Sequence, residues 1–171
     1  MTTTQDPTTR YPEAAIEADA TVPAIHIRRD FDATPAQLFR AHTDPALFAR
    51  WSGPSSVGAE ITEWDARDGG SWRYTARGID GREEFETSFH GCFHTVREDR
   101  LVQTFTWDGM PDEVALETMT FEDLGDGRTR LHAFSLCDSF EARDGWLSSG
   151  MEVGIHDGYA AIDRMLADGS L

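Results

Sequence analysis

The sequence contains no lysine, because all 15 of its basic residues are arginine, and it has only two cysteines, Cys92 and Cys137. Two thiols in a chain of 171 residues make no disulfide framework, and their spacing is not that of a CxxC motif. No stretch approaches the roughly 18 consecutive apolar residues of a transmembrane helix, and no signal peptide is visible. These absences favour a cytoplasmic protein with reduced thiols.

Positive charge is scarce throughout the chain. Lys and Arg total 15 against 31 Asp and Glu, which gives a formal net charge of −16. A field of this sign repels phosphates and anionic lipids, so we expect no binding to nucleic acid or to membranes. The hydrophobic fraction of 39% is that of a globular protein.

The common catalytic and cofactor motifs are also missing. The sequence has no GxSxG, no Walker loop, no GxGxxG and no HExxH. The usual nucleophile, phosphate, dinucleotide and metalloprotease sites therefore have no support, and we expect no cofactor.

A single domain is predicted over residues 16–168, after a polar, Thr-rich N-terminal segment, residues 1–15, that we expect to be a mobile tail. Residues 24–32, AIHIRRDFD, alternate as a strand does. Two short helices are predicted next, at 35–42 and 44–51, because each begins with a proline in its first turn.

The middle of the chain predicts a meandering antiparallel sheet. Runs with two-residue alternation are separated by turn residues such as Asp80-Gly81 and Gly125-Asp126-Gly127. The runs are VGAEITEWDA, SWRYTARG, EEFETSFHGCFHTV, RLVQTFTWDG, EVALETMTFEDL and RTRLHAFSLCD.

The last segment, SSGMEVGIHDGYAAIDRMLA, changes to helical spacing and predicts a long C-terminal helix. Gly154 and Gly158 weaken this helix, either as tolerated defects or because a missing side chain lets the helix approach the sheet or a ligand closely. The order of elements predicts an α+β fold, with a curved antiparallel sheet of about 6–7 strands around the helix and a cavity between them.

These segments resemble, in order and spacing, the AHSA1-like branch of the START/Bet v 1 (SRPBCC) superfamily, which is named after the activator of Hsp90 ATPase. The resemblance covers roughly residues 16–167 and is carried by FDATPAQLFRAHTDPALFARWSGP, WDARDGGSWRYTARGIDG, FHGCFHTVREDRLVQTFTWDG, TFEDLGDGRTRL and GMEVGIHDGYAAIDRMLA. One departure is visible: Arg97-Glu98-Asp99-Arg100 stands where the family often has Pro-Pro-Glu-Arg.

The resemblance implies a helix-grip fold with an internal hydrophobic pocket. It supplies no catalytic motif, because the branch has none in common, and fold alone does not determine function. A homodimer is compatible with the family, although the sequence shows no interface.

Alternation along the strands indicates which side chains face the cavity, although a slip of one residue inverts a strand. The expected ligand-binding residues, mostly aromatic, are Trp51, Trp72, Tyr74, Phe89, Phe93, Gln103, Phe105, Trp107, Glu117, Met119, Phe121, His132, Phe134, Met151, Ile155 and Tyr159.

The stretch His90-x-Cys92-x-His94 has metal-ligand residue types on one face of a strand. If Phe89 and Phe93 face inward, this face is the outer one. The two histidines then lie about 13 Å apart, too far to hold one zinc ion with bonds of about 2 Å. No metal site is expected.

Glu117 and His132 are predicted to face inward on neighbouring strands. A carboxyl and an imidazole in an apolar pocket could serve as acid and base, could orient a ligand, or could satisfy each other or point to solvent. All three interpretations stay open. They are the candidate catalytic residues.

One tryptophan and one segment each have two interpretations. Trp51 either rims the pocket mouth or, more commonly for such a residue, packs a helix on the sheet. The segment SFEARDGWLSS (139–149) either forms a lid or is a plain connector.

Three functions follow, in order of preference. The first is binding of a small hydrophobic molecule in an aromatic-lined cavity. The second is an enzyme of the polyketide cyclase/dehydratase or hydrolase type that uses the same pocket. The third is a protein-interaction module resembling the Hsp90 activator's domain, for which we expect an exposed apolar patch outside the pocket.

Overall fold

The computed structural model describes residues 9–171. These residues form one eight-stranded antiparallel sheet, in the order β1-β2-β8-β7-β6-β5-β4-β3, and four helices. The elements are β1 (Ala15–Ala18), β2 (Ala24–Phe31), α1 (Pro35–Thr43), α2 (Pro45–Trp51), β3 (Val57–Trp64), β4 (Ser71–Gly78), β5 (Glu86–Arg97), β6 (Arg100–Trp107), β7 (Ala115–Gly125), β8 (Arg128–Leu136), α3 (Phe140–Ser148) and α4 (Met151–Ala167).

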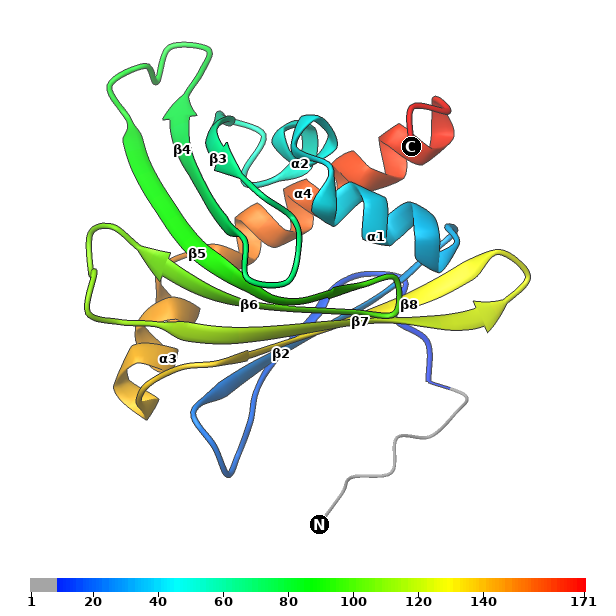
Figure 1. Ribbon diagram of the computed structural model, residues 1–171, viewed down its shortest axis with the longest axis horizontal. Coiled ribbons are helices and arrows are strands. Elements are labelled where there is room, and N and C mark those ends of the chain that lie inside the picture. The colour runs from blue at the N-terminus through cyan, green and yellow to red at the C-terminus, as the bar shows by residue number, and fades with distance from the viewer. Residues whose placement is uncertain (1–8) are drawn as a thin grey trace.

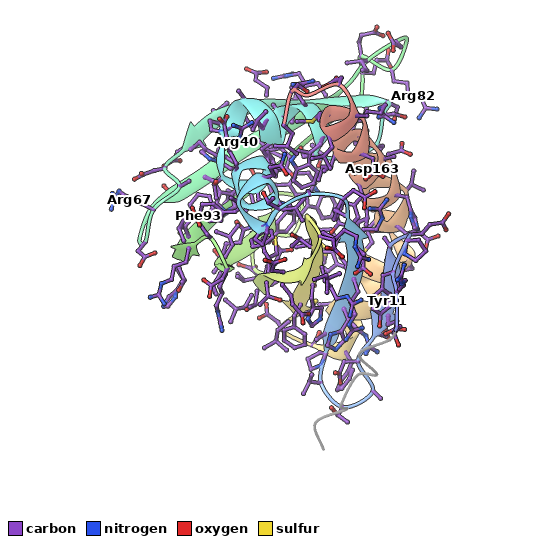
Figure 2. The ribbon with its side chains drawn as sticks, turned by 90° about the vertical axis from the view of Figure 1, so that its right-hand side faces the viewer. Tyr11, Arg40, Arg67, Arg82, Phe93 and Asp163 are labelled. Atoms are coloured by element: carbon purple, nitrogen blue, oxygen red, sulfur yellow. The ribbon has the colours of Figure 1, made fainter. Side chains whose placement is uncertain are left out.

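The sheet curls around α4, which lies across its concave side with α1 and α2 beside it (Figure 1). This is the predicted helix-grip fold. Side chains crowd the space between the sheet and the helices, whereas Arg67 and Arg82 lie at the periphery (Figure 2). Phe31, Phe93 and Ile162 are each at most 1% exposed and belong to this core.

The two short helices begin where the prolines predict. Thr34 and Gln37 form a reciprocal capping box at the start of α1, and Asp44 accepts hydrogen bonds from the Ala46 and Leu47 amides at the start of α2. Each helix has too few residues to be stable alone, so packing against the sheet must hold both in place.

The register of the β7–β8 hairpin determines which of its side chains face the interior. In this hairpin Glu117 lies opposite Ser135, Thr120 opposite His132 and Phe121 opposite Leu131. Phe121 and Leu131 are buried in the core, so Glu117 and Ser135 face the concave side with them. His132 faces the opposite, convex side.

Two elements, β1 and α3, were not predicted from the sequence. β1 extends the sheet beyond β2, so the predicted domain boundary at residue 16 falls inside a strand. The predicted tail lies partly at residues 1–8, outside the described residues. Tyr11, further along it, makes two hydrogen bonds with Asp30 of β2: its carbonyl accepts from the Asp30 amide, and its amide donates to the Asp30 carboxylate.

The segment expected to be a lid or a connector contains α3. Ser139 caps it by accepting a hydrogen bond from the Ala142 amide. Over residues 9–171, none of the helices combines the length and apolarity needed to cross a bilayer.

Gly158 lets α4 approach α2 closely. A Cβ at this position would lie 2.7 Å from the backbone oxygen of Trp51, closer than real contacts allow. The neighbour of the glycine is therefore the end of α2, and not the sheet or a ligand. Gly91 has a similar role within the sheet, because a Cβ there would lie 2.6 Å from the ring of Trp72.

Candidate functional site

Glu117 is the carboxylate of the interior. It projects from β7 towards α4 and accepts a hydrogen bond of 2.9 Å from Gln103 Nε2 on the neighbouring strand β6. Burial raises the pKa of Glu117, and the hydrogen bond from Gln103 opposes that rise. No ion pair to Glu117 is formed by any residue from 9 to 171.

Two tyrosines face the same region from opposite sides. Tyr74 projects from β4 and Tyr159 from α4. Burial raises the pKa of both hydroxyls, and the nearby Glu117 carboxylate raises them further. Its field also adds to the effect of burial on Cys137, whose pKa rises to about 11. The three groups therefore lie within electrostatic range of Glu117.

Several polar atoms of this interior have no protein partner. Among the described residues, none forms a hydrogen bond to the Tyr74 hydroxyl, the Tyr159 hydroxyl or the second carboxylate oxygen of Glu117. The indole Nε1 of Trp72 is fully buried and also lacks a partner within the described chain. Buried polar groups in proteins are almost always satisfied, so the Trp72 Nε1 requires water or a ligand, and the tyrosine hydroxyls and the Glu117 oxygen, which are not fully buried, are open to the same partner.

Aromatic rings lie on the same concave side of the sheet as these polar atoms. Trp72 stacks on Tyr74 with centroids 5.8 Å apart, and Phe89 lies 5.2 Å from both Tyr74 and Phe105. Tyr74, Phe89, Phe105 and Glu117 are only half-buried, although they face the inside of the fold. Side chains on this face thus retain accessible surface.

A cleft of about 260 Å³ meets this interior at α3. Its lining includes Trp107, Met110 and Trp146, with Glu113 and Glu141 among the remaining residues. The ring of Trp146 also contacts Phe105, with centroids 5.8 Å apart and nearly perpendicular planes. Trp146 therefore stands between the cleft and the aromatic interior.

A larger cleft, of about 550 Å³, lies elsewhere, between β2, the start of β8 and the end of α4. Arg10, Arg29 and Arg128 line it together with three aspartates, including Asp163. Arg29 donates a hydrogen bond of 2.6 Å to Asp163, which ties β2 to α4. Three arginines therefore face three aspartates in this cleft, and Phe31, which also lines it, contacts the ring of Tyr159 with centroids 5.3 Å apart.

The structure brings most of the predicted residues together on the concave face. Trp72, Phe93, Met119, Phe121 and Tyr159 are buried in the core, and Tyr74, Phe89, Phe105, Met151 and Ile155 pack against it. Gln103 and Glu117 lie among them as expected.

Two tryptophans lie elsewhere. Trp51 packs between helices, since its Nε1 donates to the Ala41 carbonyl and its ring lies 4.7 Å from that of His42. Trp107, expected inside, is 36% exposed and lines the α3 cleft, with its Nε1 bonded to Thr87.

The expected inward orientation of His132 and Phe134 is wrong. Both lie on the convex face, where His132 Nε2 is 2.9 Å from His26 Nδ1 and the ring of Phe134 contacts that of His26. On its other side, His26 Nε2 lies 3.0 Å from the Asp19 carboxylate. Burial, with Arg28 and His26 nearby, lowers the pKa of His132 to about 4. The sheet separates His132 from Glu117, so the predicted acid–base pair does not form.

The His90-x-Cys92-x-His94 stretch lies on the outer face of β5, as predicted. Cys92 is an exposed free thiol, and His90 interacts with Asp108 at 2.5 Å. Over the described part of the chain, no group of three or more His, Cys, Asp or Glu is arranged to hold a metal ion.

Sequence reasoning placed Trp146 only in a segment that forms either a lid or a connector, and it missed Ser135. Trp146 lies in a segment whose charged residues suggested a connector, and only its contact with Phe105 reveals its position. Ser135 was assigned to the outer face because the alternation of β8 was read one residue out of phase. Leu131 and Ala133 favour the correct phase, but Phe134 and Leu136 favour the opposite one, so the strand's own sequence did not decide between them.

The fold and the polar interior define a helix-grip protein. The family described as activator of Hsp90 ATPase homolog 1-like protein matches residues 32–167. The chain belongs to this family, the AHSA1-like branch of the SRPBCC superfamily. No curated protein matches the chain.

Solved structures of similar proteins come from several bacteria. A protein from Rhodobacter sphaeroides is 27% identical, with a TM-score of 0.77 over 91% of this chain and 99% of that chain. A protein from Arthrobacter aurescens is 25% identical, with a TM-score of 0.79 over 90% of this chain and 91% of that chain. Ms6760 from Mycobacterium smegmatis, 22% identical with a TM-score of 0.79 over 90% and 97%, shows the shared fold.

Proposed function

We propose that this protein binds a small, largely apolar molecule between the concave face of the sheet and α4. The observation that carries the proposal is the set of unpartnered polar atoms of Glu117, Tyr74, Tyr159 and Trp72 within an aromatic interior. A ligand with one polar end would complete their hydrogen bonds while its apolar body replaces ring contacts. We also propose a cytoplasmic location, with which the two free cysteines agree.

Access to the interior is proposed to run through the α3 cleft. Trp146 separates the cleft from Phe105, so a ligand must displace this ring. α4 begins after Gly150, which has a φ of +85° and no side-chain cap. A left-handed glycine at the α3–α4 junction provides backbone freedom for such a movement.

The test uses a neutral fluorescent probe, N-phenyl-1-naphthylamine, which is uncharged at neutral pH. Ser135 lies opposite Glu117 and faces the interior, so Ser135→Leu fills space beside the carboxylate. Thr118→Leu places the same side chain on the convex face of the neighbouring strand, β7, as a matched control. Thermal unfolding of each variant verifies that it is folded.

We expect saturable binding of one probe per chain. Ser135→Leu should weaken it by about tenfold, which corresponds to about 1.4 kcal/mol, and Thr118→Leu should leave it unchanged. Absence of saturable binding to the natural protein would overturn the proposal, as would equal weakening by the two variants.

A protein-interaction module is the second candidate, because apolar side chains are exposed around the α3 cleft. Trp107 is 36%, Met110 46% and Val114 40% exposed. This function predicts a partner whose binding is lost in Val114→Asp, a position outside the lining of the α3 cleft, while binding of the naphthyl probe persists. An unchanged interaction in that variant would count against it.

A further inference from the structure

The carboxylate of Glu117 has no positive charge paired with it, and Arg29, whose charge acts on Tyr159, is itself paired with Asp163 at 2.6 Å. Glu117 accepts its hydrogen bond from a neutral amide, and burial and that bond are the causes that shift its pKa. The titratable groups that feel its field are Tyr74 on β4, Tyr159 on α4 and Cys137 after β8, all uncharged at neutral pH. Within the described chain, no arginine or histidine pairs with this carboxylate. It is a half-buried acid that lacks a counter-ion among the described residues.

The surrounding rings favour a cation in the same place. Aromatic faces carry negative electrostatic potential, so a cation positioned over them is attracted, most strongly where water is excluded. Trp72, Tyr74, Phe89 and Phe105 form a continuous series of ring contacts, with centroids between 5.2 and 5.8 Å apart. An anionic group would meet both these ring faces and Glu117 and would be disfavoured by each.

The α3 cleft, the proposed route to the interior, is also negatively charged. Glu113 and Glu141 line the cleft, and no basic residue is among its lining residues. The whole chain has a net charge of −16. Acidic groups that line a cleft concentrate cations at its mouth and repel anions.

We infer that the ligand is an apolar amine, bound as an ammonium ion by Glu117. The unpaired carboxylate, the aromatic rings on the same face and the acidic cleft all support this ligand class. This inference rests on the proposed function and specifies its ligand class. The ammonium donates to the free carboxylate oxygen, and its aromatic or alkyl body lies among Trp72, Phe89 and Phe105. The Tyr74 and Tyr159 hydroxyls accept its remaining hydrogens.

The experiment compares three compounds with one apolar body and different charge: 1-naphthylmethylamine, 1-naphthylmethanol and 1-naphthoate. Each displaces N-phenyl-1-naphthylamine from the protein at pH 7.5, at low and at about 0.5 M salt, because salt screens the long-range field. Glu117→Gln removes the proposed counter-ion. Glu122→Gln, the same substitution at an exposed position of β7, changes the net charge equally and serves as the control.

We expect the amine to bind about tenfold or more tightly than the alcohol and the carboxylate to bind weakest. Glu117→Gln should remove the preference for the amine, and Glu122→Gln should keep it at both salt concentrations. Equal binding of amine and alcohol, tightest binding of the carboxylate, or an amine preference that survives Glu117→Gln would overturn the inference while probe binding still supported the proposed function. If the probe itself fails to bind, the proposed function fails with it.

Binding should also depend on pH in one direction. An ammonium ion pairs with the ionised form of Glu117, so a protein whose Glu117 is protonated must release that proton on binding. Affinity for 1-naphthylmethylamine should rise as pH increases from about 5 to 8, whereas affinity for the alcohol should stay constant. A flat profile for the amine contradicts the assignment.

Discussion

Gln103 donates a hydrogen bond of 2.9 Å to the carboxylate of Glu117, across the pairing of β6 with β7 and inside the aromatic interior. This bond holds the carboxylate towards the concave face while leaving its second oxygen free. An isolated acid in such a position costs stability when it is ionised. The arrangement makes the interior a candidate binding site and also a source of pH-dependent stability.

The first prediction concerns Glu117→Gln. Because burial raises the pKa of Glu117 above its ordinary 4.5, its contribution to stability is present below pH 4.5 and is lost as pH rises through the raised value. The variant lacks this loss. Its free energy of unfolding relative to the natural protein should therefore increase between pH 5 and 8, by about 1.4 kcal/mol per unit of pKa shift. Chemical denaturation at several pH values measures this difference, and a pH-independent difference would contradict it.

His42 should give the opposite pH dependence. It is 5% exposed, its Nδ1 donates to the Leu38 carbonyl, and burial lowers its pKa from 6.5 to about 4. The stability associated with neutral His42 is present above pH 6.5 and is lost as pH falls towards 4, by up to about 3 kcal/mol. His42→Gln should flatten this part of the profile. His156→Gln, at an exposed position of α4, should leave it unchanged, and a similar effect of both variants would refute the assignment.

Two glycines in helices should respond in opposite ways to alanine. Gly158→Ala places a Cβ 2.7 Å from the Trp51 carbonyl oxygen and should destabilise the protein by about 1–3 kcal/mol. Gly145→Ala in α3 meets nothing within 4 Å and should stabilise it by about 0.5–1 kcal/mol. Thermal unfolding of the two variants tests the pair. A neutral Gly158→Ala would show that α2 and α4 can separate at no cost.

Trp146 should control the rate of ligand exchange. Trp146→Ala removes the ring between the α3 cleft and Phe105, so both the association and the dissociation of N-phenyl-1-naphthylamine should accelerate, by about tenfold. Phe140→Ala removes a 47% exposed ring from the same helix and should leave both rates unchanged. Stopped-flow fluorescence measures the two rates. Unaltered exchange in Trp146→Ala would mean that ligands enter by another route.

Local signals were sufficient for most of the secondary structure. The prolines at the starts of α1 and α2, the Asp80-Gly81 turn with both φ values positive, and the helical stripe of α4 each act over a few residues. β1 escaped prediction because a four-residue edge strand is defined by its pairing with β2, a contact that lies outside its own sequence. α3 escaped because it has a weak apolar stripe and depends on contacts with β2 and α4.

The sequence by itself determined the fold: its alternating runs, turn residues and terminal helix agree on one helix-grip arrangement, and the inward position of Glu117 followed from the apolar Met119 and Phe121 on the same strand. The partner of Glu117 was a tertiary matter. β8 carries apolar residues on both faces, since Leu131 packs in the core while Phe134 packs on His26, so its alternation has no unique phase. Only the register of β8 against β7 decides that Ser135, and not His132, lies inside, because pairing across strands fixes the face on which a side chain emerges.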